Sequence, residues 1–430
     1  MSRPAWIVVA LLGVALRMSI LPLRVPPVDD SWRAWTYHTT LEGPARMYGP
    51  RGHVVTFGDI EAPVVYPPLA LDEMAVIGRV YRAVEDGAFP DGVGLTIAIK
   101  MAVVLFDAAL TAVIFFSVRS VAGMRAASWG AAAYWLNPAI LMATTLGYVD
   151  ALVALPAVAA LVAASAGRSW LAGGLCAAAV MTKPQGILVA PAVALALWNA
   201  GTADTALRRI TEAAAACAVV VALLIAPLVA AGTLYFMLRS VAVLAGHNML
   251  SATAFNVWWV VSYAADVVAL RAHGLAALVL AHPSVLPQAA FAERGLPHPR
   301  LMAALLLGPT VAWALWAGLR ARDLGLQAAL AALIVDAYFT WFVQVHENHF
   351  FLVIPLLVIA AALRPAFGPV LMALSISFAL SLYLVLGGDG NGPPELAISF
   401  TGIDSTILLS MINCGLFIWL AAVFARAAAD

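Results

Sequence analysis

Two adjacent acidic residues, Asp29 and Asp30, follow the first apolar segment of the chain and have the chemistry of a general base. A carboxylate at the boundary between lipid and water is partly desolvated, and a second negative charge beside it raises its pKa toward the range useful for accepting a proton. The structural alternative is that Asp30 caps a helix over 31–42. Trp32 and Trp35 share one face of such a helix, as membrane-interface anchors or as a platform for a sugar ring.

A second polar group lies near residue 347, where the chain reads Val-His-Glu-Asn-His. It is not a zinc-protease helix, because that motif needs two histidines four residues apart and His346 and His349 are three apart. The two rings can still share a face and donate N–H groups to an anion such as a phosphate, with Glu347 beside them. Interfacial histidines without a ligand are the alternative.

Five further residues are candidate contacts for a substrate. Tyr66 precedes two prolines, and Asp150 begins a helical segment, where a helix cap is the simpler interpretation. Lys183 and Gln185 stand on either side of a proline that breaks an apolar run. Lys183 there can bind a phosphate, or its ammonium can simply extend to the membrane surface. Asn256 lies among aromatic residues, either as a satisfied loop residue or as a sugar contact.

Lys100 and Asp107 lie inside an apolar segment and are seven residues apart. Two helical turns separate them by about 10 Å, so they are not expected to pair with each other. Ionisable groups within a membrane are costly and are functional candidates by default. A structural bridge to other helices and a ligand role both remain open for this pair.

The composition decides the class of protein. Of 430 residues, 63% are hydrophobic and 11% are charged, whereas a soluble domain carries about 25% charged residues. This excludes a soluble enzyme, a disordered chain and a disulfide scaffold. The formal net charge of zero gives no indication of a nucleic-acid partner. The three cysteines lie in apolar runs and no cluster of metal ligands is evident, so we expect no metal and no other cofactor.

Apolar segments of about 20 residues predict an all-α polytopic membrane protein of about 12 spans in one domain, 1–430. The first segment is not expected to be a cleavable signal, because Arg17 interrupts it and no small-residue cleavage site follows.

Orientation follows from arginines in the short connections, which gather on one side if the N-terminus is cytoplasmic. They are Arg3, Arg119, Arg125, Arg168, Arg208, Arg209, Arg320, Arg322, Arg364 and Arg426. Two long loops, 23–93 and 234–300, then face outward. We expect the apolar pieces 257–270 and 274–281 to be interfacial or re-entrant helices, with an extra membrane hairpin as the alternative. All candidates except Lys100 and Asp107 fall on this outer face, which predicts one outward-facing site next to the membrane.

The candidate residues belong to six short motifs whose order resembles that of the GT-C superfamily of integral-membrane glycosyltransferases. The motifs read Asp-Asp…Trp, Tyr-Pro-Pro-Leu, Asn-Pro-Ala-Ile…Gly-Tyr-Val-Asp-Ala, Thr-Lys-Pro-Gln, Ala-Phe-Asn-Val-Trp-Trp and His-Glu-Asn-His, within about 25–355. The resemblance is to bacterial relatives of the dolichyl-phosphate-glucose glucosyltransferases and to polyprenyl-phosphate-mannose mannosyltransferases. Tyr148 departs from the usual glutamine, and Asn348-His349 stands in place of the usual Arg-Tyr.

The resemblance implies a GT-C-like bundle and an inverting transfer of mannose, glucose or a pentofuranose from a polyprenyl-phosphate donor to a lipid-linked or glycan acceptor. It gives the role of base to Asp29 or Asp30 and places His346 beside the donor phosphate. It also implies a bacterial cytoplasmic membrane, with the site on the periplasmic or extracytoplasmic face and membrane lipids as partners.

Two other classes of function remain open. A secondary transporter or lipid flippase of about 12 spans would place ionisable residues near the bilayer midplane, and Lys100, Asp107, Asp266 and Asp336 are candidates, but no internal repeat is visible. A non-catalytic membrane scaffold, or a degenerate glycosyltransferase that partners an active subunit, would fit the departures at Tyr148 and His349.

Overall fold

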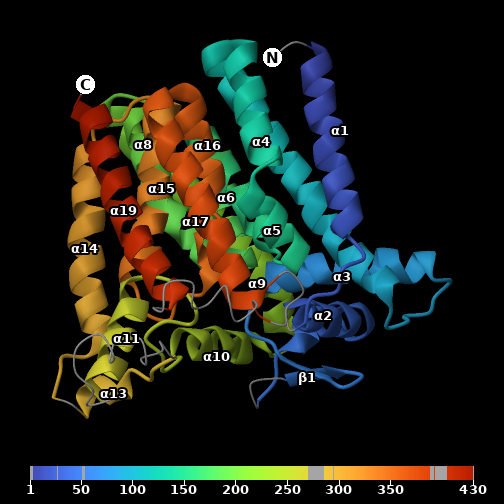
Figure 1. Cartoon of the computed structure of the whole chain (residues 1–430). Coiled ribbons are helices and arrows are strands. Elements are labelled where there is room, and N and C mark those ends of the chain that lie inside the picture. The colour runs from blue at the N-terminus through green and yellow to red at the C-terminus, as the bar shows by residue number, and fades with distance from the viewer. Residues whose placement is uncertain are drawn as a thin grey trace. The chain divides into compact units, whose positions relative to one another are not determined.

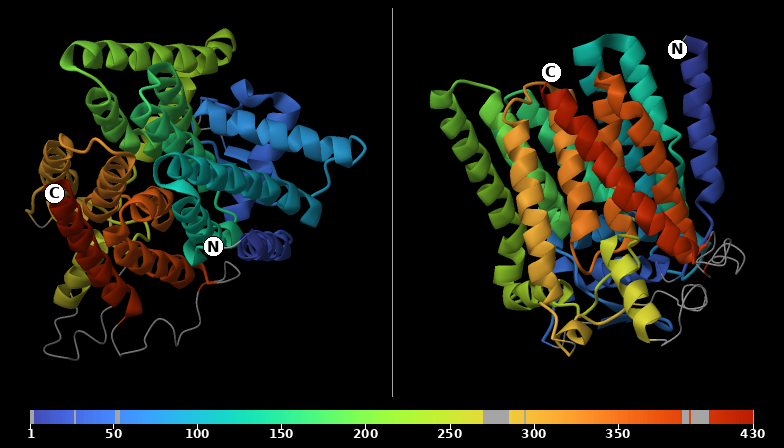
Figure 2. Two further views of the ribbon diagram at one scale, coloured as in Figure 1. Left: turned by 90° about the horizontal axis from the view of Figure 1, so that it is seen from above. Right: turned by 60° about the vertical axis from the view of Figure 1, so that its left-hand side comes forward.

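The computed structural model describes residues 3–26, 28–50, 54–269, 285–293, 295–387, 392 and 404–429. The chain divides into two compact units, Met1–Gly246 and His247–Asp430. Each unit is described by itself. In both of them helices dominate (Figures 1 and 2).

The first unit contains a set of apolar helices that provides its core. Helix α1 packs on α4 and α5, α6 packs on α4, α7 and α8, and α9 packs on α7 and α8. Their bounds are α1 (Arg3–Ile20), α4 (Val93–Trp135), α5 (Pro138–Leu146), α6 (Asp150–Ser165), α7 (Ser169–Thr182), η2 (Pro184–Val189), α8 (Ala190–Asn199) and α9 (Ala203–Ala230), followed by the short α10 (Leu234–Ala245).

The long loop between α1 and α4 is itself folded. It forms α2 (Val28–Glu42), η1 (Pro44–Met47), the antiparallel hairpin β1 (Val54–Phe57) and β2 (Ile60–Pro63), and α3 (Pro68–Val84). Figure 1 shows these elements at the end of the unit where α1 finishes. Helices α2 and α3 approach closely at Gly78, where an added Cβ would lie 1.9 Å from Oγ1 of Thr40. This close packing fixes the helix that carries the two adjacent aspartates.

Local sequence signals explain the ends of α5. Asn137 caps its start by accepting a hydrogen bond from the Ala139 amide, and Pro138 occupies the first helical position. Gly147 ends the helix with φ of 83°, a left-handed conformation in which glycine pays no Cβ penalty. The chain therefore turns sharply between α5 and α6.

A buried ion pair joins three helices of the first unit. Arg17 in α1 donates to the Trp135 carbonyl at 2.7 Å and to Oδ2 of Asp107 at 3.3 Å. Tyr134 and Thr144 donate to the two oxygens of the same carboxylate, at 2.7 and 3.2 Å. Of the two roles that the sequence left open for Asp107, these contacts support a structural bridge between helices. Because its carboxylate is held by fixed donors, this residue gives no support to a transporter.

The second unit is a bundle of apolar helices. Figure 2 shows α14, α15, α17 and α19 running along one another. Helix α15 is buried along almost its whole length between α14, α16 and α19. The elements are α11 (Val257–Ala269), α13 (Ala289–Ala292), α14 (Pro299–Gly318), α15 (Leu324–Trp341), η3 (Glu347–Phe350), α16 (Val353–Leu363), η4 (Pro365–Phe367), α17 (Gly368–Leu386) and α19 (Ser405–Ala429).

Within the described residues, six helical stretches are long and apolar enough to cross a membrane, and seven shorter apolar helices accompany them. The chain is an integral membrane protein, as its composition predicts. One stretch, Val93–Leu146, contains a non-helical residue at Gly123, with φ of 78°, so the chain is interrupted there. The total of about 12 spans stays a prediction. Helix α11 occupies most of the apolar piece 257–270, while 274–281 lies outside the described residues.

Candidate functional site

Asp29 is the most enclosed of the candidate catalytic groups. It lies in the first turn of α2, is 2% exposed, and its Oδ2 accepts a hydrogen bond from the Val25 amide at 2.8 Å. Lys100 from α4 places its Nζ 4.0 Å from the same oxygen. The other oxygen lies against the turn after α5, because a Cβ on Gly147 would be only 2.1 Å from it. Three separate elements therefore hold this carboxylate.

Burial sets the basicity of Asp29. Desolvation raises the pKa of this carboxyl above its ordinary value and outweighs the lowering effects of Lys100, the Val25 amide and Arg33. The neighbouring negative charge of Asp30 adds a further increase. Lys100 is itself fixed, since its ammonium donates to the carbonyls of Leu23 and Thr145. The arrangement gives a buried carboxylate that is a stronger base than an exposed aspartate.

Asp30 is more exposed than Asp29 and has a different cationic partner. Its side chain is 25% exposed and forms a 2.8 Å ion pair with Arg24, which is 42% exposed. Helix α2 begins at Val28, earlier than the predicted segment 31–42, so Asp30 lies within the first turn and is not the capping residue. A carboxylate there interacts favourably with the helix dipole.

Trp32, Trp35 and Tyr66 form one aromatic cluster. The centroids of the three rings lie 5.1–5.4 Å apart with edge-to-face packing. Both tryptophans are buried, and neither indole N–H has an acceptor among the described residues. A buried donor without an acceptor carries a desolvation cost that hydroxyl or phosphate oxygens of a ligand would remove. The cluster is therefore suited to a polar ligand rather than to simple anchoring.

Lys183 and Asp150 form a buried ion pair beside this cluster. Nζ of Lys183 lies 2.6 Å from Oδ1 of Asp150 and 5.7 Å from the centroid of the Tyr66 ring. Burial alone would lower the pKa of Lys183, but the charge of Asp150 and the contact with Tyr66 raise it, so the ammonium stays charged. Lys183 is 3% exposed and does not extend to the surface. Gln185 follows in η2 and is half-buried.

In the second unit, His346 and His349 lie together after α15. Their ring centroids are 5.5 Å apart, and the ring of Tyr338 stacks on His349 at 6.1 Å. Both histidines are half-buried, whereas Glu347 and Asn348 between them are buried. The predicted shared face of the two histidines is thus present.

The backbone around His346 is unusual. His346 forms isolated β-bridges with Ala252 and Thr253, and Thr253 donates a hydrogen bond to the Glu347 carboxylate. Thr253 and Gln344 have φ of 73° and 65°, which non-glycine residues rarely adopt. Strain of this kind persists where the surrounding contacts impose it and is often found at functional sites.

Asn256 is a structural residue in this structure. It is fully buried; its amide donates to the Phe339 carbonyl at 2.8 Å, and its oxygen accepts from the amides of Trp258 and Trp259 at the start of α11. Of the two interpretations of its sequence context, a satisfied polar residue is the one these contacts support.

Comparison with known structures decides the fold. The whole chain superimposes on the crystal structure of ArnT from Cupriavidus metallidurans bound to undecaprenyl phosphate, with a TM-score of 0.53, 13% identity, and coverage of 100% of this chain and 78% of ArnT. This chain has the same fold as ArnT. The apo-state ArnT structure matches at 15% identity and a TM-score of 0.49, over 99% of this chain and 77% of that one. No family model matches the sequence, and no curated protein sequence does either.

Sequence reasoning missed several residues of the site. Lys100 is a functional candidate from its place in an apolar segment, but its position next to Asp29 is not predicted from the sequence. Gly147 belongs to one of the sequence motifs, but the motif gives it no role. Its contact with Asp29 depends on the fold of α5. Glu73 was not singled out, although it is an acidic residue on an apolar face of α3, together with Val76 and Ile77. Among the described residues, no group of three or more His, Cys, Asp or Glu could hold a metal ion.

Proposed function

We propose that this protein is an inverting glycosyltransferase that moves a sugar from a polyprenyl-phosphate donor to an acceptor hydroxyl. The observation that carries the proposal is Asp29, a buried carboxylate with a raised pKa that three elements hold in place. A whole-chain likeness to a GT-C structure that contains undecaprenyl phosphate supports it.

The chemistry needs little more than a base and charge stabilisation. The acceptor oxygen attacks the anomeric carbon, the bond from that carbon to the phosphate oxygen breaks, and the phosphate leaves with the electron pair. Asp29 takes the proton of the attacking hydroxyl, so the carboxylate must be ionised before the step. The configuration at the anomeric carbon inverts because the displacement is direct.

The donor phosphate calls for hydrogen-bond donors and positive charge. We assign His346 and His349 to this role, because their rings lie together and imidazole N–H groups can donate to a phosphate. Lys183 has a subsidiary part, since Asp150 already balances its charge. Trp32 and Trp35 supply the buried N–H donors for sugar oxygens, with Tyr66 beside them, and Gln185 is a further proposed substrate contact.

We further propose that the site faces the extracytoplasmic side of a bacterial cytoplasmic membrane. The arginines of the short connections support this orientation, since positive charge favours the cytoplasmic side. The donor sugar is mannose, glucose or a pentofuranose, and the acceptor is lipid-linked or a glycan.

The test uses the purified chain in lipid nanodiscs with a panel of polyprenyl-phosphate sugars. Transfer from one of these donors, with inversion at the anomeric carbon, is the expected result. The control is the corresponding nucleotide sugar, which we expect to be inert. Activity with the nucleotide sugar alone, or none with any lipid donor, would contradict the proposal.

A further inference from the structure

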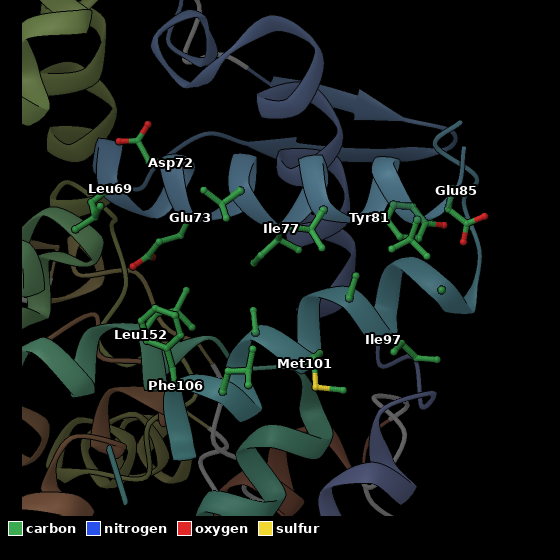
Figure 3. A pocket seen from close by; sticks show the side chains of 17 residues that line it. Leu69, Asp72, Glu73, Ile77, Tyr81, Glu85, Ile97, Met101, Phe106 and Leu152 are labelled. Atoms are coloured by element: carbon green, nitrogen blue, oxygen red, sulfur yellow. The ribbon is translucent and has the colours of Figure 1, made fainter. Parts of the chain in front are cut away.

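A groove of about 680 Å³ runs along α3 in the first unit. Leu69, Val76, Ile77, Val80 and Val84 of α3 form one wall, and the start of α4 forms the other. Figure 3 shows the two helices with these side chains between them. The volume lies within the range of small-molecule sites, and its walls are almost entirely apolar.

Charge distinguishes the two ends of the groove from its walls. Glu73 lies at one end and Glu85 at the other, about 18 Å apart at 1.5 Å per helical residue. Asp72 is the third acidic residue at the groove, and Figure 3 shows its carboxylate turned away from the space. None of the 17 lining residues is a lysine, arginine or histidine.

Glu73 reaches into the groove. Figure 3 shows its carboxylate between α3 and α4, near Leu152. Thr182, the last residue of α7, forms a hydrogen bond with the carboxylate, and no lysine, arginine or histidine lines the groove beside it. Its Oε2 is shielded from water and has no hydrogen-bond partner among the described residues. One acceptor position is therefore left for a ligand that donates a hydrogen bond.

The charges that line this groove differ from those expected at a phosphate-binding site. A lipid phosphate would find no lysine, arginine or histidine among the lining residues to balance its charge, and burying an unbalanced charge is unfavourable. The two buried lysines of this unit act elsewhere: Lys183 pairs with Asp150, and Lys100 lies beside Asp29. A hydrocarbon chain with a donating head group fits both the walls and the end of the groove.

We propose that the groove between α3 and α4 binds the acceptor, and that this acceptor is a lipid whose head group at Glu73 donates a hydrogen bond and carries no negative charge. The inference rests on the proposed function, and it narrows the acceptor from a lipid or glycan to a lipid. Burial raises the pKa of Glu73 to about 8, in spite of the Thr182 hydrogen bond and with a further increase from Asp72. Near neutral pH the carboxyl of Glu73 can thus form a hydrogen bond with either a hydroxyl or an ammonium group.

Photo-crosslinking in nanodiscs tests the groove. Two diazirine probes share the same alkyl chain, one with a primary amine head and the other with a phosphate head. We expect the amine probe to label α3 and the start of α4, as read by peptide mass spectrometry, and the phosphate probe to label them weakly. E73Q removes a charge-assisted hydrogen bond and should lower labelling by the amine probe about tenfold.

Two matched substitutions control for the fold. V80W fills the middle of the groove and should abolish labelling by both probes, whereas V219W puts the same bulk on an exposed position of α9 and should leave labelling unchanged. Stronger labelling by the phosphate probe would overturn the inference and make this the donor groove. Labelling of wild-type protein elsewhere than α3 and α4 would also overturn it.

Transfer kinetics separate this inference from the proposed function. V80W should raise KM for the acceptor and leave KM for the donor unchanged. If wild-type protein transfers sugar and V80W does so with unaltered acceptor KM, the groove is not the acceptor site. If wild-type protein transfers no sugar at all, the proposed function fails, and the labelling result stands by itself.

Discussion

Replacing Asp29 by asparagine removes the proposed base and changes almost nothing else. Asparagine has the same shape, and its oxygen can still accept the hydrogen bond from the Val25 amide. General-base catalysis contributes about 10²–10⁴-fold, so kcat should fall by that factor, which equals about 2.7–5.4 kcal/mol of transition-state stabilisation. Lys100 keeps its hydrogen bonds to two carbonyls, so the loss of stability should stay below about 3 kcal/mol.

Asp30→Asn is the matched control. This residue is partly exposed and pairs with an exposed arginine, a contact worth about 0–1 kcal/mol. We expect kcat close to that of wild-type protein. The assay is single-turnover transfer from the polyprenyl-phosphate sugar in nanodiscs, with thermal unfolding of each variant measured in parallel. A large loss of kcat in Asp30→Asn, with Asp29→Asn active, would refute the assignment based on burial.

The pH profile gives an independent measure of the same group. The reaction needs the ionised carboxylate, so kcat/KM should fall as the pH falls through the pKa of Asp29. Burial raises that pKa above the ordinary value of an aspartate, so the midpoint should lie above about 3.9. Lys100→Met removes a positive charge that lowers the pKa of Asp29, so the midpoint should move to higher pH. An unchanged midpoint would show that another group titrates.

Three further outcomes follow from the same contacts. His346→Ala should weaken donor binding about tenfold or more, as expected for a lost hydrogen bond to a charged group, and equal donor affinity by isothermal titration would contradict its role. Gly147→Ala should reduce transfer, because its Cβ would lie 2.1 Å from Asp29 in a left-handed turn; retained kcat would contradict the close contact. Asp150→Asn should destabilise the protein by about 3–5 kcal/mol, because it leaves Lys183 buried without its partner. Asp150→Leu combined with Lys183→Met should recover thermal stability, and a failure to recover it would argue against a simple ion pair.

The sequence was sufficient for the class of fold, and it proposes two adjacent residues for the base. Few charges and long apolar segments require a membrane protein, and two adjacent carboxylates after an apolar helix are a signal that can be read locally. The choice between Asp29 and Asp30 could not be made in this way. Their difference depends on Lys100 and Gly147, which are about 70 and 120 residues distant in the chain and come close only in the folded unit.

The pairing of charged residues within the membrane could not be predicted from the sequence either. The expectation that Asp107 does not pair with Lys100, two turns away, is confirmed, but its partner Arg17 lies 90 residues earlier. The unpartnered indole groups of Trp32 and Trp35 are a property of packing, and no spacing rule reports them. Glu73 left a weak local signal, because an acidic residue interrupts an otherwise apolar helix face.

The Arg17–Asp107 pair has a consequence for how the chain enters the membrane. Helix α1 carries in its last turn an arginine that is completely enclosed, and an unpaired charge within a membrane segment is costly. The first helix emerges from the ribosome long before α4, which carries the compensating carboxylate. Its stable insertion therefore waits for a segment synthesised later, and α1 should remain close to the translocon until α4 joins it.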